Sequence, residues 1–253
     1  MSLHPLPGTR NESSSAPVTI YFTRHGETML NLLGRVQGWS DAPLTEKGRA
    51  VASHLGTGLA DAGVRIDAAY AADMLRHGET ISLALGELPY AGEIVRDERL
   101  REMAFGRFEG ASNTEMWGAI SGELEKANGG PVAEDEFDFD VALAAMVRLN
   151  EGSGLVAETA AQVAERALAA LNAIAEAQAA NGGGNVLVVS SGITIVSAIS
   201  AMGANLDRVT TGIGNGAVTE LRYSAGDWTV VTVNDLSFVE AGQAAQAAEA
   251  ATA

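Results

Sequence analysis

Four consecutive apolar residues, Val186-Leu-Val-Val189, constrain the fold of this chain more than any other stretch of its sequence. A strand that is apolar on both faces is typical of the centre of a parallel sheet, where helices cover both sides. Residues 18–23 form a second β-branched and apolar candidate strand, bounded by Pro17 and Gly26. Because segments with helical spacing alternate with these strands, the sequence predicts an α/β fold. We expect three layers, α/β/α, with a mostly parallel central sheet.

The remaining elements follow from the spacing of apolar residues, which is three or four in helices and two or continuous in strands. The predicted helices cover residues 45–62, 75–85, 157–180 and 193–202, and the other predicted strands cover residues 66–70, 217–223 and 228–233.

One domain is predicted over residues 18–239. Residues 106–156 are less regular, with Gly-rich turns and the acidic run Glu134–Asp140, and are expected to form an insertion or cap. Residues 1–17, rich in Ser and Pro, are expected to be a flexible leader. The Ala-rich tail, residues 240–253, is compatible with either a weak helix or disorder.

The charge balance excludes some partners. Lys and Arg total 16 and Asp and Glu total 32, so the formal net charge is −16, which repels nucleic acid and anionic membranes. A local basic pocket would still bind a small anion. The chain contains no cysteine, which excludes disulfides, thiolate zinc sites and cysteine nucleophiles. With no signal peptide or membrane-spanning run visible, we expect a cytoplasmic protein.

The pentapeptide Arg24-His-Gly-Glu-Thr28 directly follows the first predicted strand, where α/β folds place ligand chemistry. A histidine there acts as a nucleophile through one ring nitrogen if a backbone carbonyl holds the other. The adjacent arginine suits phosphate oxygens. The same five letters recur at residues 76–80, but in a helical context and with no matching flanks, so the repetition is interpreted as coincidence.

Several further blocks share one order along the chain with this motif. They are Thr23-Arg-His-Gly-Glu-Thr28 with Asn31, Arg35-Val-Gln-Gly38, Asp41-Ala-Pro-Leu-Thr45 with Gly48, Tyr70-Ala-Ala-Asp-Met-Leu-Arg76 with Glu79-Thr80, Leu100-Arg-Glu-Met-Ala-Phe-Gly106 with Glu109-Gly110, and Val186 to Gly192. Taken together, this series resembles the histidine phosphatase superfamily, also called the phosphoglycerate mutase-like family.

The resemblance implies a phosphohistidine mechanism. His25 would accept the phosphoryl group, Arg24 and Arg76 would hold its oxygens, and Glu102 would protonate the leaving oxygen and then deprotonate water. No metal and no cofactor is implied. The residues expected to contact phosphate or substrate are Thr28, Asn31, Gln37, Gly38, Ser191 and Gly192.

Structural roles compete with several of these assignments. Arg76 is also compatible with a helix surface, and Glu102 with an ion pair to Arg99 or Arg101. Capping or turn roles explain Thr28, Asn31 and Gln37 about as well as ligand contact.

One position departs from the family pattern. The family ends its last block as Val-Ser-His-Gly, whereas this chain reads Val189-Ser-Ser191-Gly192. Loss of a preorganised donor typically costs on the order of 10²–10³ in rate. Three explanations are compatible with Ser191. The protein is a slow phosphatase, or it is a pseudo-enzyme that only binds phosphorylated metabolites, or position 191 was changed by engineering. A fourth hypothesis has His77 as the replacement, but the family usually has Ala at this position and His77 is predicted to face solvent.

The acidic segment that contains Glu102 is more similar to the phosphatase branch than to the mutases, so we rank hydrolysis above isomerisation. The expected ligand is a small phosphorylated metabolite or inorganic phosphate, and a homodimer is compatible with the sequence. The aromatic and Met residues of the insertion predict a partly apolar lid or a cap core: Phe105, Phe108, Met116, Trp117, Phe137 and Phe139.

Overall fold

The computed structural model describes residues 16–130, 138–210 and 212–252. A six-stranded sheet forms the centre, with strand order β3-β2-β4-β1-β5-β6. The first four strands of this order run parallel to one another, β5 is antiparallel to β1, and β6 is antiparallel to β5. The strands are β1 (Val18–Arg24), β2 (Ala68–Ala71), β3 (Ile94–Arg96), β4 (Gly184–Ser190), β5 (Val218–Ser224) and β6 (Asp227–Asp235).

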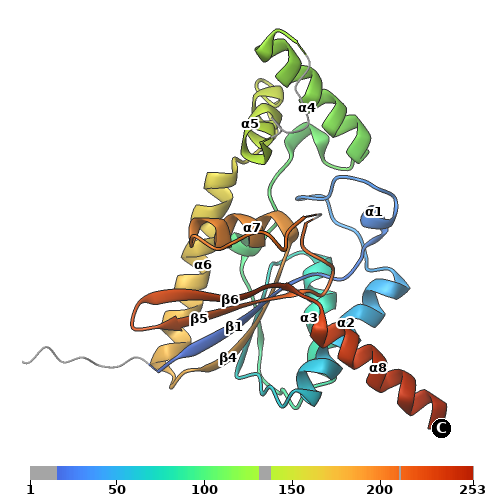
Figure 1. The fold of residues 1–253 in the computed structure, drawn as a ribbon, viewed down its shortest axis with the longest axis vertical. Helices are drawn as coiled ribbons and strands as arrows, with labels where there is room; N and C mark the ends of the chain where they lie inside the picture. Colours follow the sequence, from blue (N-terminus) through green and yellow to red (C-terminus); the bar gives the residue numbers. More distant parts are fainter. Residues whose placement is uncertain (1–15, 131–137, 211, 253) are drawn as a thin grey trace, which may run out of the picture.

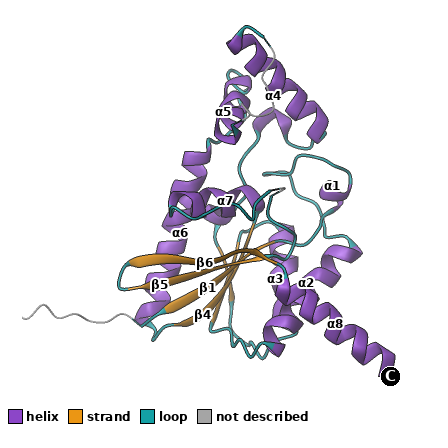
Figure 2. Cartoon of the chain, viewed as in Figure 1, coloured by secondary structure: helices purple, strands orange, loops and turns teal. Residues whose placement is uncertain are grey.

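Helices cover both faces of this sheet, so the predicted three-layer α/β/α fold is confirmed (Figures 1 and 2). The two short 3-10 turns are η1 (Glu98–Leu100) and η2 (Gly106–Phe108). The α-helices are α1 (Met29–Leu32), α2 (Glu46–Asp61), α3 (Leu75–Gly86), α4 (Asn113–Asn128), α5 (Phe139–Leu149), α6 (Ala160–Ala180), α7 (Gly192–Ala201) and α8 (Ser237–Thr252).

The side chains of the central strands point alternately to the two faces of the sheet, so the core has two halves. Ile20 and Val188 point to the side of α6 and α7, whereas Tyr21 and Leu187 point to the side of α2 and α3. Successive side chains of a strand face opposite sides, so a strand that is buried on both sides must be apolar throughout. This is the physical basis of the run Val186–Val189, which pairs with both β1 and β2.

The insertion is more regular than its sequence predicts. Residues 113–128 and 139–149 form α4 and α5, which project from the end of the sheet (Figure 1). Met116, Ile120 and Leu124, spaced four apart, pack with α5 in a separate hydrophobic cluster. We call residues 106–156 the cap. Part of the predicted acidic run, 134–137, lies outside the described residues, as does most of the predicted leader.

The Ala-rich tail is not a separate appendage. Residues from 237 onward form α8, which packs along α2. The helices approach closely at two glycines, because a Cβ on Gly58 would collide with the carbonyl of Phe238 and a Cβ on Gly242 with that of His54. Of the two states left open for the tail, the structure therefore has the helix, and it begins before the predicted domain boundary at 239.

Candidate active site

His25 is the first residue after β1 and is buried where the carboxyl ends of β1 and β4 meet. The backbone N–H of His25 donates to the carbonyl of Ser190 at 3.0 Å. Its Nδ1 lies 2.7 Å from the carbonyl oxygen of Gly26, so Nδ1 carries the proton and Nε2 keeps a free lone pair. Burial and the charges of Arg76 and Arg24 lower the pKa of His25 well below its usual value. A neutral ring fixed through Nδ1 presents Nε2 as a nucleophile.

Buried donors without a protein acceptor lie around this ring. Among the described residues, Nε of Arg24, Nε of Arg76 and Nε2 of Gln37 have no hydrogen-bond partner. Such groups are rare, because an unpaired buried donor costs about 1–3 kcal/mol. Arg24, Gln37 and His25 line one cavity of about 220 Å³. Positive charge, unpaired donors and a small cavity together form a site for a small anion.

Arg76 is held from three directions and is completely buried. Its Nη1 donates to the carbonyl of Ser40 at 3.1 Å and to Oδ1 of Asp41 at 3.0 Å, and its Nη2 donates to the carbonyl of Gly38 at 2.7 Å. The alternative of a surface arginine is therefore wrong. The carbonyl of Gly38 accepts a hydrogen bond from Arg76, and its N–H donates to Glu109, so the backbone of Gly38 connects these two side chains.

The residues at the start of α1 combine capping with placement of an amide. Thr28 is the N-cap of α1, and it forms a capping box with Asn31. The Thr28 hydroxyl also donates to Oε1 of Gln37 at 2.6 Å, which orients the amide and leaves Nε2 unpaired. Asn31 lines the same cavity as His25. The capping and site interpretations of these residues are therefore compatible.

Glu102 lines the same cavity as His25 and Arg24. Its carboxylate accepts the N–H groups of Met103 at 2.9 Å, Ile193 at 3.1 Å and Thr194 at 3.0 Å. Two of these groups belong to the first turn of α7, whose positive end favours a carboxylate. These bonds hold the carboxyl group in one orientation beside Arg24, with which it lines two cavities.

The ion-pair alternative for Glu102 is wrong. Arg99 pairs with Asp97 at 2.6 Å, and Arg101 pairs with Asp73 at 2.5 Å. Arg101 also lies over the ring of Trp39, 5.0 Å from its centre.

The expectation that His77 faces solvent is also wrong. His77 is fully buried in the first turn of α3, and its Nε2 lies 2.7 Å from Oγ of Ser191. Its ring meets that of His25 edge-on, with the ring centres 5.3 Å apart. Leu75, the first residue of α3, is exposed, but Arg76 and His77 in the same turn are buried against the ends of β1 and β4, so this side of the turn is enclosed. Ser191 is the N-cap of α7, and Gly192 follows it beside the Arg24 side chain.

Three supporting residues were not singled out from the sequence. Glu109 accepts four backbone N–H groups, three of them from residues 38–40 and one from Phe105. Thr80 accepts the N–H of Gly26 at 3.0 Å, and Asn215 donates to the carbonyl of His25 at 2.8 Å. Glu109 and Thr80 belong to the quoted sequence blocks, so only the role of each was missing.

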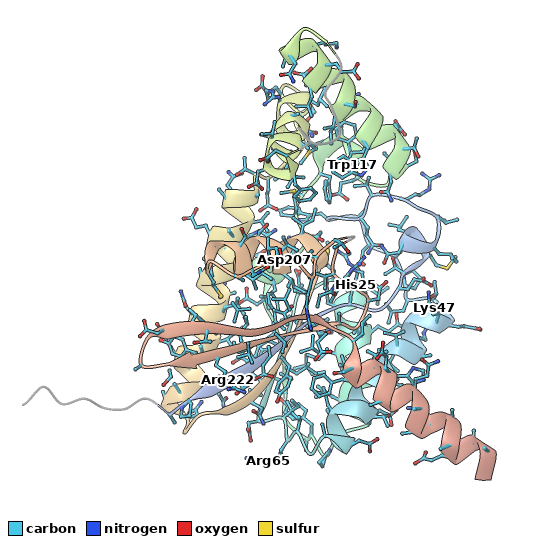
Figure 3. All side chains as sticks on the ribbon, in the orientation of Figure 1. His25, Lys47, Arg65, Trp117, Asp207 and Arg222 are labelled. Carbon is cyan, nitrogen blue, oxygen red and sulfur yellow. The ribbon has the colours of Figure 1, made fainter. Side chains whose placement is uncertain are left out.

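A second cavity of about 580 Å³ adjoins Arg24 and Glu102. Its other walls are mainly apolar and include Phe139, Ile193, Val196, Leu206, Val209 and Ile213. Figure 3 shows His25 between the sheet and the cap, with Trp117 on the cap side.

The predicted lid residues divide into two groups. Phe105, Phe108 and Met116 are buried in the hydrophobic cluster of the cap, and Phe105 and Met116 also line the cavity beside His25. The rings of Trp117 and Phe139 lie 6.2 Å apart, and each lines a cavity at the site. Phe137 lies outside the described residues.

Residues 20–236 match the model of the histidine phosphatase superfamily (branch 1). The chain belongs to this superfamily. It is 36% identical to the 2,3-bisphosphoglycerate-dependent phosphoglycerate mutase of Brucella ovis over 104 residues, 40% of this chain. The matched region spans about half (50%) of the length of that curated relative.

Solved structures of other proteins share this fold over most of the chain. A phosphoglycerate mutase from Bacillus anthracis is 36% identical, with a TM-score of 0.78, covering 90% of this chain and 98% of its own. A mycobacterial glucosyl-3-phosphoglycerate phosphatase is 21% identical, with a TM-score of 0.61, covering 87% and 99%. The second likeness shows the fold alone.

Two further features concern only the described ranges. Every helix there is too short or too polar to cross a lipid bilayer. The same ranges contain no cluster of three or more His, Asp or Glu side chains arranged to hold a metal ion.

Proposed function

We propose that this superfamily member hydrolyses a small phosphomonoester through a phosphohistidine on His25. The observation that carries the proposal is the neutral His25 ring, whose Nε2 is free beside the unpaired donors of Arg24, Arg76 and Gln37. Phosphoryl transfer depends mainly on positioning and on stabilising charge around the phosphorus, which these groups supply.

In the first step, Nε2 of His25 attacks phosphorus and the ester P–O bond breaks. Arg24, Arg76 and Gln37 donate to the non-bridging oxygens as negative charge shifts toward the leaving group. The departing oxygen takes a proton from the carboxyl group of Glu102. In the second step, water attacks phosphorus, the P–N bond breaks, and Glu102 takes the proton from that water. Inorganic phosphate and an alcohol are the products.

Glu102 suits this exchange of protons by its position. It is fixed by three backbone N–H groups and, like Arg24, lines both cavities. A general acid must lie within hydrogen-bond reach of the leaving oxygen. We therefore propose that the phosphoryl group lies toward His25 and that the alcohol lies toward the apolar cavity, whose size admits a compact organic group.

Position 191 bears on the rate of the proposed reaction. We propose that Ser191 stands where relatives carry a second histidine, and that this makes turnover slower than in relatives with the histidine. The missing imidazole is equally compatible with a pseudo-enzyme that binds phosphorylated metabolites. Assays of turnover and of binding separate these two functions.

The test combines turnover with a trapped intermediate. Hydrolysis of p-nitrophenyl phosphate and of a panel of sugar and glycerate phosphates is measured for the wild type and for His25→Ala. The proposal expects turnover that His25→Ala abolishes, and an acid-labile phosphate on His25 after rapid quenching. Phosphate binding without any turnover would establish the binding protein instead.

A phosphoglycerate mutase is the second candidate, favoured by the 36% identity and TM-score of 0.78 to the Bacillus anthracis enzyme. It would return the phosphoryl group from His25 to a second hydroxyl rather than to water. Conversion of 3-phosphoglycerate to its 2-isomer faster than release of inorganic phosphate would support this function over hydrolysis.

A further inference from the structure

His77 and Ser191 form a buried pair that the proposed chemistry does not yet use. Both side chains are fully buried, and Nε2 of His77 lies 2.7 Å from Oγ of Ser191. The two residues come from different elements, α3 and the start of α7, and are 114 positions apart in the chain. The His77 ring also contacts the ring of His25, so the pair lies directly beside the proposed nucleophile.

The hydrogen-bond direction within this pair follows from the other ring nitrogen. Nδ1 of His77 is buried and has no partner among the described residues. An unpaired buried N–H is more costly than an unpaired lone pair, so the proton belongs on Nε2. Burial and the charge of Arg76 lower the pKa of His77, which keeps the ring neutral with one proton. His77 therefore donates to Ser191, and the Ser191 hydroxyl hydrogen remains available for another acceptor.

The strand register places Ser191 next to His25. Arg24 and Ser190 are register partners at the ends of β1 and β4, so His25 and Ser191 are the next residue on each strand. The hydroxyl of Ser191 makes no cap bond to α7, because Glu102 accepts N–H groups of that first turn. Ser191 is thus at a helix N-cap without a capping bond, beside the nucleophile and held by an imidazole.

We propose that Ser191 donates its hydroxyl hydrogen to a phosphoryl oxygen bound at His25, and that His77 positions Ser191 by donating Nε2–H to its oxygen. This inference rests on the proposed function. A donor chain in which one group polarises the next strengthens the terminal hydrogen bond. The imidazole that the family supplies from the strand end at 191 is supplied here from α3, one residue after Arg76.

We call the two hydrogen bonds from His77 to Ser191 and from Ser191 to the phosphoryl oxygen the relay. Four variants test it: His77→Ala, Ser191→Ala, the double variant, and His77→Gln, whose amide keeps a donor. We expect Ser191→Ala to lower kcat about 100-fold and His77→Ala about 10-fold. The double variant should lose no more than Ser191→Ala, because His77 acts only through Ser191. His77→Gln should recover part of the loss. Each rate is measured per folded molecule, with Tm recorded in parallel.

An exchange variant provides a matched gain of function. His77→Ala combined with Ser191→His moves the imidazole to the position that the family uses. It should be at least as active as the wild type, whereas Ser191→His alone places two imidazoles in one buried space and should lower Tm.

Binding of orthovanadate, measured by calorimetry, is the second readout, since it needs no turnover. His77→Ala should weaken vanadate binding about 10-fold, in line with its effect on kcat. If a folded His77→Ala variant keeps wild-type kcat, KM and vanadate affinity, the relay is wrong while the proposed function stands. If the wild type neither turns over phosphomonoesters nor forms a phosphohistidine, the proposed function is wrong, and vanadate affinity alone decides the relay.

Discussion

Asp41 connects the guanidinium of Arg76 to the backbone of α3. Its Oδ1 accepts from Nη1 of Arg76 at 3.0 Å, and its Oδ2 accepts the N–H of Leu75 at 2.5 Å. Arg76 is fully buried, whereas the Asp41 side chain is 26% exposed. One carboxylate therefore neutralises a buried charge and fixes the helix turn that carries it, which leaves Nε of Arg76 free for a ligand.

We expect Asp41→Asn to lower kcat/KM about 10-fold and to destabilise the fold by about 2 kcal/mol, because a buried arginine loses its counter-ion. The amide still accepts a hydrogen bond, so the protein should remain folded. Enzyme kinetics and urea denaturation measure the two effects. Glu220→Gln is the matched control, since it breaks the exposed pair with Arg222, far from His25, and should change neither quantity measurably. Equal effects of the two variants would contradict the role of Asp41.

Thr28→Val tests whether Thr28 acts through Gln37. The substitution removes the hydroxyl that donates to Oε1 of Gln37, so the amide loses its fixed orientation. We expect KM for phosphomonoesters to rise about 10-fold, and helix capping worth about 1 kcal/mol to be lost. Thr28→Ser keeps the hydroxyl and should behave as the wild type. An additive loss in the double variant Thr28→Val with Gln37→Ala would show that the residues act independently.

Glu109→Gln tests the support of the loop that carries Gln37 and Gly38. The Glu109 carboxylate accepts four backbone N–H groups, whereas an amide offers one acceptor oxygen and two donors. We expect a loss of about 2 kcal/mol in unfolding free energy and a fall in kcat/KM. Urea denaturation and kinetics provide the measurement. Glu115→Gln, at an exposed position of α4, serves as control, and an equally small effect of both would argue against this role.

Acid should destabilise the protein through the buried His25 and His77. Burial lowers the pKa of both His25 and His77 in the folded state, while the unfolded chain titrates near its usual value of about 6.5. Below that pH the unfolded state binds protons that the folded state does not, so stability falls as pH falls. The slope reaches about 1.4 kcal/mol per pH unit for each histidine.

Urea denaturation between pH 7.5 and pH 5.0 measures this slope. The window separates the histidines from Asp73 and Asp97, whose pKa values lie below the usual range and whose contribution is lost only in stronger acid. His77→Gln should reduce the slope, and the double variant with His25→Gln should reduce it further. A slope that neither substitution changes would mean that other groups cause the acid sensitivity.

Much of the scaffold was predictable because its signals are local. The strand at residues 18–23, the helices at 45–62 and 75–85, and the apolar strand around Val186–Val189 all lie within a few residues of their observed bounds. The two helices of the cap were not predicted, although Met116, Ile120 and Leu124 have helical spacing. Gly118 and Gly122 interrupt that pattern and weaken helical propensity, and burial against α5 outweighs their cost only in the folded chain.

The sequence by itself determined which residue types lie at the end of each strand: Arg24 and His25 at the end of the first, and Ser191 directly after the apolar fourth. It also determined that the strand containing Val186–Val189 is buried on both faces, because an exposed strand would not be apolar throughout. Only the tertiary structure decided that His77 faces Ser191 and His25 rather than water. Helical periodicity shows which residues share a face, but whether a first turn is enclosed depends on what packs over it. Here that packing comes from distant parts of the chain: His25 at the end of β1, and Ser191 at the start of α7, which is 114 positions from His77.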